Sequence, residues 1–70
     1  MNQIPFTPED LKILEQFVFK SRSDPDEKGG FTYKAWAPFT PFSETGTSMD
    51  DAMYNVKRQV IDLYHRNRRA

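Results

Sequence analysis

A long amphipathic helix near the end of the chain is the feature that most constrains the fold. Its apolar residues recur at helical spacing and fall on one stripe: Met49, Ala52, Met53, Val56, Val60, Leu63 and Tyr64. Thr47 or Ser48 is expected to cap its first turn. A single apolar stripe must be buried against another layer. Because the chain has only 70 residues, that layer must come from the residues ahead of the helix.

The segments before the helix carry strand patterns. "GFTYKAWAP" alternates, with Phe31, Tyr33, Ala35 and Ala37 on one side and Thr32, Lys34 and Trp36 on the other. "FVFK" favours an earlier strand over about residues 13–21, and "FTPFSE" favours a short third segment. The polar stretch "SRSDPDEKGG" connects the first two strands. The predicted fold class is α+β: an antiparallel sheet of about three strands (β-β-β-α) with one C-terminal amphipathic helix packed on one face.

The stretch "IPFTPEDLKILEQF" supports two interpretations. Thr7 could cap a helix with Pro8 at its first position, followed by two acidic residues. The apolar residues also fit a strand, and we expect at most one helical turn before it. The sequence leaves open whether residues 7–13 are helix or strand.

Composition narrows the possible classes of protein. The chain has no cysteine, which excludes a disulfide framework and a cysteine metal site. Its formal net charge is zero, whereas nucleic-acid-binding proteins are usually basic. No apolar run approaches the ~18 residues that a spanning helix needs, and the first residues do not resemble a signal peptide. These features predict a single cytoplasmic domain over residues 1–70.

Some apolar residues lie outside the single interior that a sheet and one helix provide. In the strand interpretation, Leu14 and Val18 share the second sheet face with Trp36, and Tyr54 and Ile61 lie on the helix flank. Apolar side chains in such places need a cover, and another chain is the expected one. We therefore predict a protein interface at Leu14, Val18, Trp36, Tyr54 and Ile61.

No residue pattern indicates catalysis, a cofactor or a metal. His65 is the only histidine, and a histidine near a helix end is usually a surface residue. The acids of residues 24–27 lack the spacing of a calcium loop, and Gly29–Gly30 is too short for a phosphate loop. We predict that the chain is not an enzyme and has no catalytic, cofactor-binding or metal residues.

The second half of the chain resembles the HicB-like family of antitoxins. In that family a glycine pair and an aromatic residue open a strand, and a proline ends it. A glycine-containing loop with a threonine then leads to a helix. Here Gly29-Gly30-Phe31 opens the strand, Pro38 closes it, and the loop "PFTPFSETGTS" leads to "MDDA". The family's Gly-Cys pair is replaced by Phe42-Ser43. Within the family pattern, Gly46 is expected to take a positive φ.

The resemblance implies a short HicB-like domain without the C-terminal DNA-binding part. It implies an antitoxin-like module that forms a homodimer or higher oligomer and masks a partner protein, such as a small basic RNA-binding toxin. Residues 24–27 carry acids that would complement a basic partner. The alternatives are an orphan or phage-type small inhibitor, and a nucleic-acid-binding protein that uses the basic end of the helix. Possible nucleic-acid contacts are Lys57, Arg58, Arg66, Arg68 and Arg69.

Overall fold

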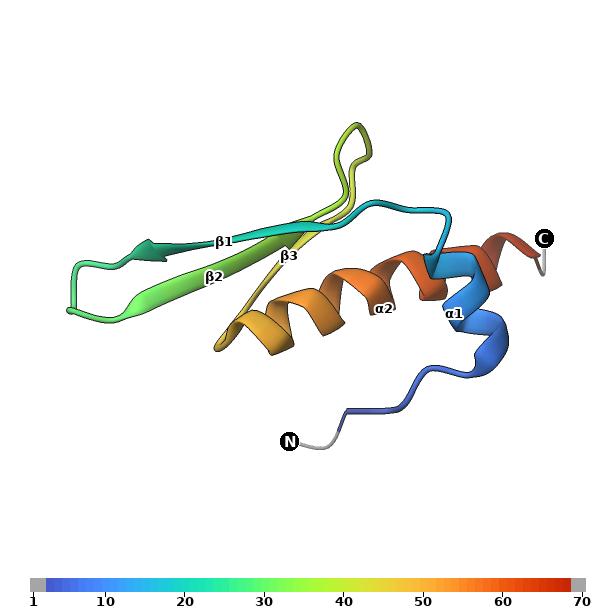
Figure 1. Cartoon of the computed structure of the whole chain (residues 1–70), viewed down its shortest axis with the longest axis horizontal. Coiled ribbons are helices and arrows are strands. Elements are labelled where there is room, and N and C mark those ends of the chain that lie inside the picture. The colour runs from blue at the N-terminus through green and yellow to red at the C-terminus, as the bar shows by residue number, and fades with distance from the viewer. Residues whose placement is uncertain (1–2, 69–70) are drawn as a thin grey trace.

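The computed structural model describes residues 3–68, which form one sheet and two helices. In chain order the elements are α1 (Pro8–Leu14), β1 (Lys20–Pro25), β2 (Phe31–Trp36), β3 (Ser43–Gly46) and α2 (Met49–Arg68). The three strands form an antiparallel sheet in the order β1-β2-β3. α2 runs along one face of the sheet, and α1 lies near the C-terminal end of α2 (Figure 1). The α+β class and the β-β-β-α order are confirmed, with a short helix added in front.

The boundaries predicted for the first strand are wrong. Residues 8–14 form α1, because Thr7 and Asp10 make a full capping box and Pro8 occupies the first turn. The Thr7 hydroxyl accepts the Asp10 backbone N–H at 3.1 Å, and Asp10 Oδ2 accepts the Thr7 N–H at 3.1 Å. The first strand instead begins at Lys20 and is almost entirely polar. The strand prediction followed the aromatic content of "FVFK", but residues 17–19 belong to the α1–β1 connection and only Lys20 belongs to β1.

The apolar interior consists of two clusters along α2. Near the start of the helix, Ala52 and Val56 pack against Ala35 of β2. Near its end, Val60 and Ile61 pack against α1 through Ile13 and Leu14. The first helix therefore covers a flank of α2 that the predicted β-β-β-α fold would leave open.

Gly46 is required because β3 and α2 approach closely there. A Cβ at this position would lie 2.4 Å from the backbone nitrogen of Ala52 and 2.8 Å from the carbonyl carbon of Asp51. Its φ is not positive, since Gly29 is the one glycine with positive φ among the described residues. The expected positive φ at Gly46 is wrong, and the need for a glycine comes from steric contact.

Two polar contacts fix the start of α2 against the sheet. Ser48 caps the helix, and its hydroxyl accepts the Asp51 backbone N–H at 3.1 Å. Asn55 Nδ2 donates to the Thr45 carbonyl at 2.9 Å, which occupies part of the outer edge of β3. Within residues 3–68, no helix is both long and apolar enough to cross a membrane.

Candidate functional site

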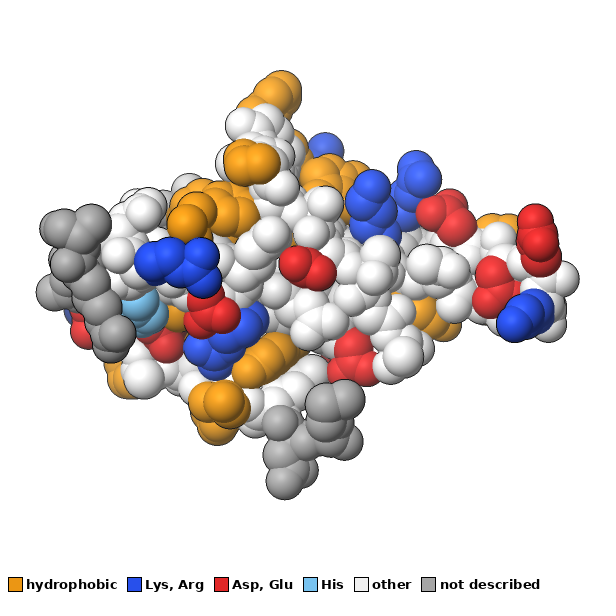
Figure 2. All heavy atoms as spheres, turned by 180° about the vertical axis from the view of Figure 1, so that it is seen from behind, with side chains coloured by type: hydrophobic (Ala, Val, Ile, Leu, Met, Phe, Trp, Pro, Cys, Tyr) orange, Lys and Arg blue, Asp and Glu red, His pale blue; other side chains and the backbone are white. Residues whose placement is uncertain are grey.

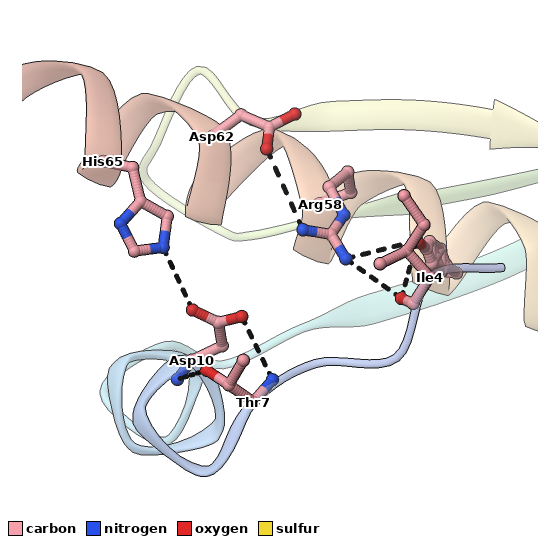
Figure 3. A network of polar contacts seen from close by, with 7 residues as sticks. Ile4, Thr7, Asp10, Arg58, Asp62 and His65 are labelled. Carbon is pink, nitrogen blue, oxygen red and sulfur yellow. Dashed lines mark hydrogen bonds and ion pairs between the residues drawn. The ribbon is translucent and has the colours of Figure 1, made fainter.

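An N-terminal arm, residues 3–7, is fastened to α2 by a cluster centred on Arg58 (Figure 3). The Ile4 carbonyl accepts hydrogen bonds from the Tyr54 hydroxyl at 2.9 Å and from Arg58 Nη2 at 3.0 Å. The Phe6 ring stacks on Tyr54 with centroids 5.2 Å apart, and the Arg58 guanidinium lies 4.7 Å from the Phe6 centroid. Arg58 also contacts Asp62 at 3.9 Å. The guanidinium of Arg58 thus has partners within the chain, and it holds the arm against α2.

A second polar contact joins the two helices. Asp10 is buried, and its Oδ1 lies 3.1 Å from Nε2 of His65 (Figure 3). Burial alone would raise the pKa of Asp10. The hydrogen bonds from the Thr7 backbone N–H and from the side chains of His65 and Thr7 outweigh burial, so the pKa lies below its ordinary value of 3.8. Asp10 therefore serves as a charged link between the cap of α1 and the last turns of α2.

The other basic residues predicted to contact nucleic acid are not gathered into one free surface. Lys57 Nζ lies 5.8 Å from the Phe19 ring centroid, toward the α1–β1 connection. Arg66 is exposed and lies beside a groove between β3 and α2. The side chain of Arg68 and the whole of Arg69 lie outside the described residues. With Arg58 fastened to the arm, the described part of this set offers only a dispersed positive charge.

The interface predicted from apolar residues is partly wrong. Leu14 is only 7% exposed and Ile61 0%, because α1 packs on α2, so neither is available for a partner. Tyr54 is half-buried under Phe6. Val18 is 68% exposed but lies in the α1–β1 connection, outside the sheet. Tyr54 and Ile61 do lie on the flank of α2, as predicted, but the arm and α1 cover them. Trp36 lies on the sheet face away from α2, as predicted, and is half-buried.

The uncovered face of the sheet carries a basic and aromatic surface, which we call the open face. Because Ala35 packs on α2, alternation places Lys34 and Trp36 on the opposite side. The register sets Lys20 opposite Trp36 and Arg22 opposite Lys34. Figure 2 shows Lys and Arg side chains gathered beside hydrophobic ones near the protruding β2–β3 loop. The open face is thus positively charged, with one tryptophan in its midst.

A shallow hollow lies on the open face next to the β2–β3 loop. It measures about 320 Å³ and is lined by Arg22, Lys34, Trp36, Thr40, Pro41, Phe42 and Ser43. The loop is held in shape by Thr40, whose backbone N–H and hydroxyl both donate to the Ala37 carbonyl, at 3.2 and 2.6 Å. At its tip, Phe39 is fully exposed and has a φ of 65°, which is unusual for a bulky residue. Two cations and a large ring therefore border one concavity.

A second concavity, of about 580 Å³, lies between β3 and α2. Its walls carry both signs of charge: Glu44 and Asp62 face Arg58 and Arg66. Arg58 Nε and Gln59 Oε1 are buried there without a hydrogen-bond partner among the described residues. The charges of this groove offset one another, whereas those of the open face are mostly positive.

The basic residues of the open face were missed as site residues, although the sequence contains their signal. Lys20 and Arg22 alternate with serines in "KSRSD", and Lys34 and Trp36 alternate in "TYKAW". The assignment of "SRSD" to a connection obscured the first half of this pattern. Within the described residues, no group of three or more His, Cys, Asp or Glu side chains could hold a metal ion.

Comparisons with family models, with curated proteins and with solved structures found no match to this chain. The resemblance to HicB-like antitoxins therefore stays a prediction, and the case for function depends on the geometry of the open face.

Proposed function

We propose that this protein is a non-enzymatic binding module whose binding surface is the open face of its sheet. One observation carries the proposal: α2 covers a single face of the sheet, and the other face presents Trp36 beside Lys20, Arg22 and Lys34. A row of three cations with a single acid favours a negatively charged partner. Asp24 is the one acid in this row, and its Oδ2 is already paired with Arg22 Nε at 2.9 Å.

The surroundings of His65 support a role without catalysis. Its Nε2 faces Asp10, and the other oxygen of that carboxylate holds the cap of α1. A general base needs a reacting group within hydrogen-bond reach. Here the imidazole instead serves the contact between two helices.

An antitoxin-like role is the second candidate, and it would use a different part of the surface. The β1–β2 hairpin projects beyond the start of α2, and its end carries Asp26 and Glu27 (Figure 1). Asp26 Oδ1 accepts the N–H groups of Lys28 and Gly30, both at 2.8 Å, so the acidic turn is ordered. A small basic toxin would meet this turn, because the open face would repel it. An orphan or phage-type inhibitor of a basic protein would use the same turn.

Two-dimensional NMR of the isotopically labelled protein tests both candidates. Titration with a heparin oligosaccharide, a polyanion, should shift the amides of Lys20, Arg22 and Lys34 and the indole N–H of Trp36. Shifts confined to α2, for example at Lys57 and Arg66, would refute the open face as the binding surface. Titration with a polylysine peptide should shift Asp26 and Glu27 if the acidic turn receives a basic partner.

Self-association is part of the same proposal, and it is tested by measuring mass in solution. The exposed apolar side chains Val18, Phe31 and Phe39 are surfaces that a second copy could cover. Sedimentation equilibrium of the wild type and of Trp36→Glu gives the two masses. A dimer that Trp36→Glu dissociates would place the interface on the open face. A wild-type monomer would remove self-association from the proposal.

A further inference from the structure

The charges of the open face are arranged at a cost to folding. Arg22 and Lys34 are directly opposite each other on neighbouring strands, and like charges in such a pair are destabilising. Lys20 lies opposite Trp36 in the next cross-strand pair on this face, and it adds a third positive charge. Among the described residues, the ion pair between Arg22 Nε and Asp24 Oδ2, at 2.9 Å, is the one such pair on this face, and the side chain of Arg22 stays 63% exposed. An anion bound across these strands would relieve the repulsion.

The ring beside these cations restricts the kind of anion. Trp36 is half-buried at the edge of the hollow, with Arg22 and Lys34 along one side and the β2–β3 loop along the other. A concavity of about 320 Å³ suits one planar ring system rather than a folded domain. Phe39, fully exposed at the tip of the same loop, offers a second ring nearby. Aromatic side chains beside a track of cations are the elements that bind unpaired nucleotides.

We propose that the open face binds single-stranded nucleic acid, with a base stacked on Trp36 and the adjoining phosphates on Lys20, Arg22 and Lys34. The inference rests on the proposed function, since it names the anionic partner of the same surface. A duplex is disfavoured, because its bases are stacked on one another and cannot reach the indole. An acidic peptide would satisfy the cations and leave the ring of Trp36 without a planar partner.

This assignment differs from binding through the basic end of α2. Arg58 is stacked on Phe6 and bonded to Ile4, and Lys57 lies over Phe19, so both have partners inside the chain. The open-face cations, by contrast, meet mainly solvent. The chain's zero net charge is compatible with this site, because Asp24 is the one acid on the open face, while Asp26 and Glu27 lie at the hairpin end and Asp50 and Asp51 at the start of α2.

Trp36 is the chain's only tryptophan, so its fluorescence reports directly on the site. Adding an oligouridylate of about 12 nucleotides at about 50 mM salt should quench this fluorescence. Three phosphate contacts on a single strand predict a slope of about −2 for log K against log salt, hence roughly a 20-fold loss of affinity at about 200 mM. Lys34→Gln should reduce the slope to about −1.4. Trp36→Leu should weaken binding at least ~10-fold, measured by anisotropy of a labelled oligonucleotide.

Lys12→Gln is the matched control, because Lys12 is an exposed lysine on α1, away from the sheet. It should leave the affinity almost unchanged, and an effect equal to that of Lys34→Gln would overturn the site. Equal binding of a duplex of the same length would also overturn it.

If poly-glutamate binds as tightly as the oligouridylate, the nucleic-acid assignment fails while the proposed function stands. If neither polyanion binds at low salt, both fail. If the fluorescence of Trp36 falls as the protein concentration rises, without any oligonucleotide, a second copy of the chain occupies the open face and the assignment is overturned.

Discussion

The two sides of the sheet use the same kinds of side chain in opposite ways. On the α2 side, the cation of Arg58 lies against two aromatic rings, with Ile4 and Asp62 as polar partners. On the open face, Arg22 and Lys34 oppose each other next to Trp36, and only Asp24 pairs with Arg22. On the first side the chain supplies partners for its cation and its rings. On the second, the cations are exposed and Trp36 is half-buried, and this difference is the basis for proposing the open face as the binding surface.

The comparison predicts that substitutions on the α2 side mainly lower stability, whereas substitutions on the open face leave stability unchanged or raise it. A domain of this size has a thin margin of stability, so losses on the α2 side should be easy to measure. The following predictions run from the largest expected effect to the smallest.

Gly46→Ala should be the most damaging change. The added Cβ would overlap backbone atoms of α2, which cannot rotate away as a side chain can. We expect a loss of about 3 kcal/mol in the free energy of unfolding, measured by urea denaturation. Gly30→Ala is the control, since its Cβ would meet only the flexible carboxylate of Asp26, at 3.1 Å. Equal losses for the two variants would show that β3 and α2 are not held as closely as the structure indicates.

Arg58→Ala should cost about 2 kcal/mol, because the change removes the stacked cation and uncovers the rings of Phe6 and Tyr54. The loss should accompany faster amide exchange in residues 3–7, which Arg58 helps to hold. Arg66→Ala removes an exposed arginine from the same helix and should change stability by less than about 0.5 kcal/mol. If Arg58→Ala were as mild as Arg66→Ala, the arm would not depend on this cluster.

Asp10 should make stability depend on pH. Its pKa is lower in the folded chain than its ordinary 3.8, so its contribution is complete above that value. The contribution is lost as the pH falls through the folded pKa. Asp10→Asn should therefore lower stability by about 1.5 kcal/mol at neutral pH and make no difference at the acid end. Asp62→Asn, at a carboxylate that is 58% exposed, is the control and should change stability at neutral pH by less than about 0.5 kcal/mol.

Sequence analysis was more accurate for the α2 side of the sheet than for the open face. The stripe on α2 correctly predicted Ala52, Val56 and Val60 in the interior, because one face of a long helix has a strong period. The prediction is wrong at the end of the stripe, where Leu63 and Tyr64 are 37% and 43% exposed. The alternation in β2 correctly placed Trp36 away from the helix. The helical period of α2 and the alternation in β2 both arise because one face of the element packs directly against the interior. Sequence periodicity predicts contacts of this kind well.

The errors arose where local signals competed. A capping box at Thr7 and Asp10 turned the predicted start of the first strand into α1, and this helix then buried Leu14 and Ile61. Periodicity within α2 could not show that a second helix would cover its flank, because that contact depends on the chain direction after Leu14. The positive charge of the open face depends on strand register, which pairs Arg22 with Lys34 and Lys20 with Trp36, 12 and 16 positions apart. Register is a tertiary property, and the sequence of a polar strand specifies it only weakly.

Phe39→Gly should raise the stability of the free protein by about 1 kcal/mol, because a φ of 65° is strained for phenylalanine and easy for glycine. No packing is lost, since the ring is fully exposed. The same change should weaken binding of the oligouridylate if the ring serves the open face. Phe39→Leu keeps the strain without the aromatic ring, so it should weaken binding without stabilising the fold. A Phe39→Gly variant that is destabilised would show that the tip contributes to folding.

Lys34→Glu should give the smallest change in stability and the clearest separation of the two sides. It converts the like-charge pair with Arg22 into a pair of opposite charges, so the free energy of unfolding should rise by about 0.5 kcal/mol. Because the gain is electrostatic and exposed, it should shrink as salt is added. Binding of the oligouridylate should be lost in the same variant. Lys12→Glu reverses a charge on α1 and should produce neither effect. A Lys34→Glu protein that is less stable would mean that Lys34 supports the sheet, and the contrast between a side built for folding and a side left for a ligand would no longer hold.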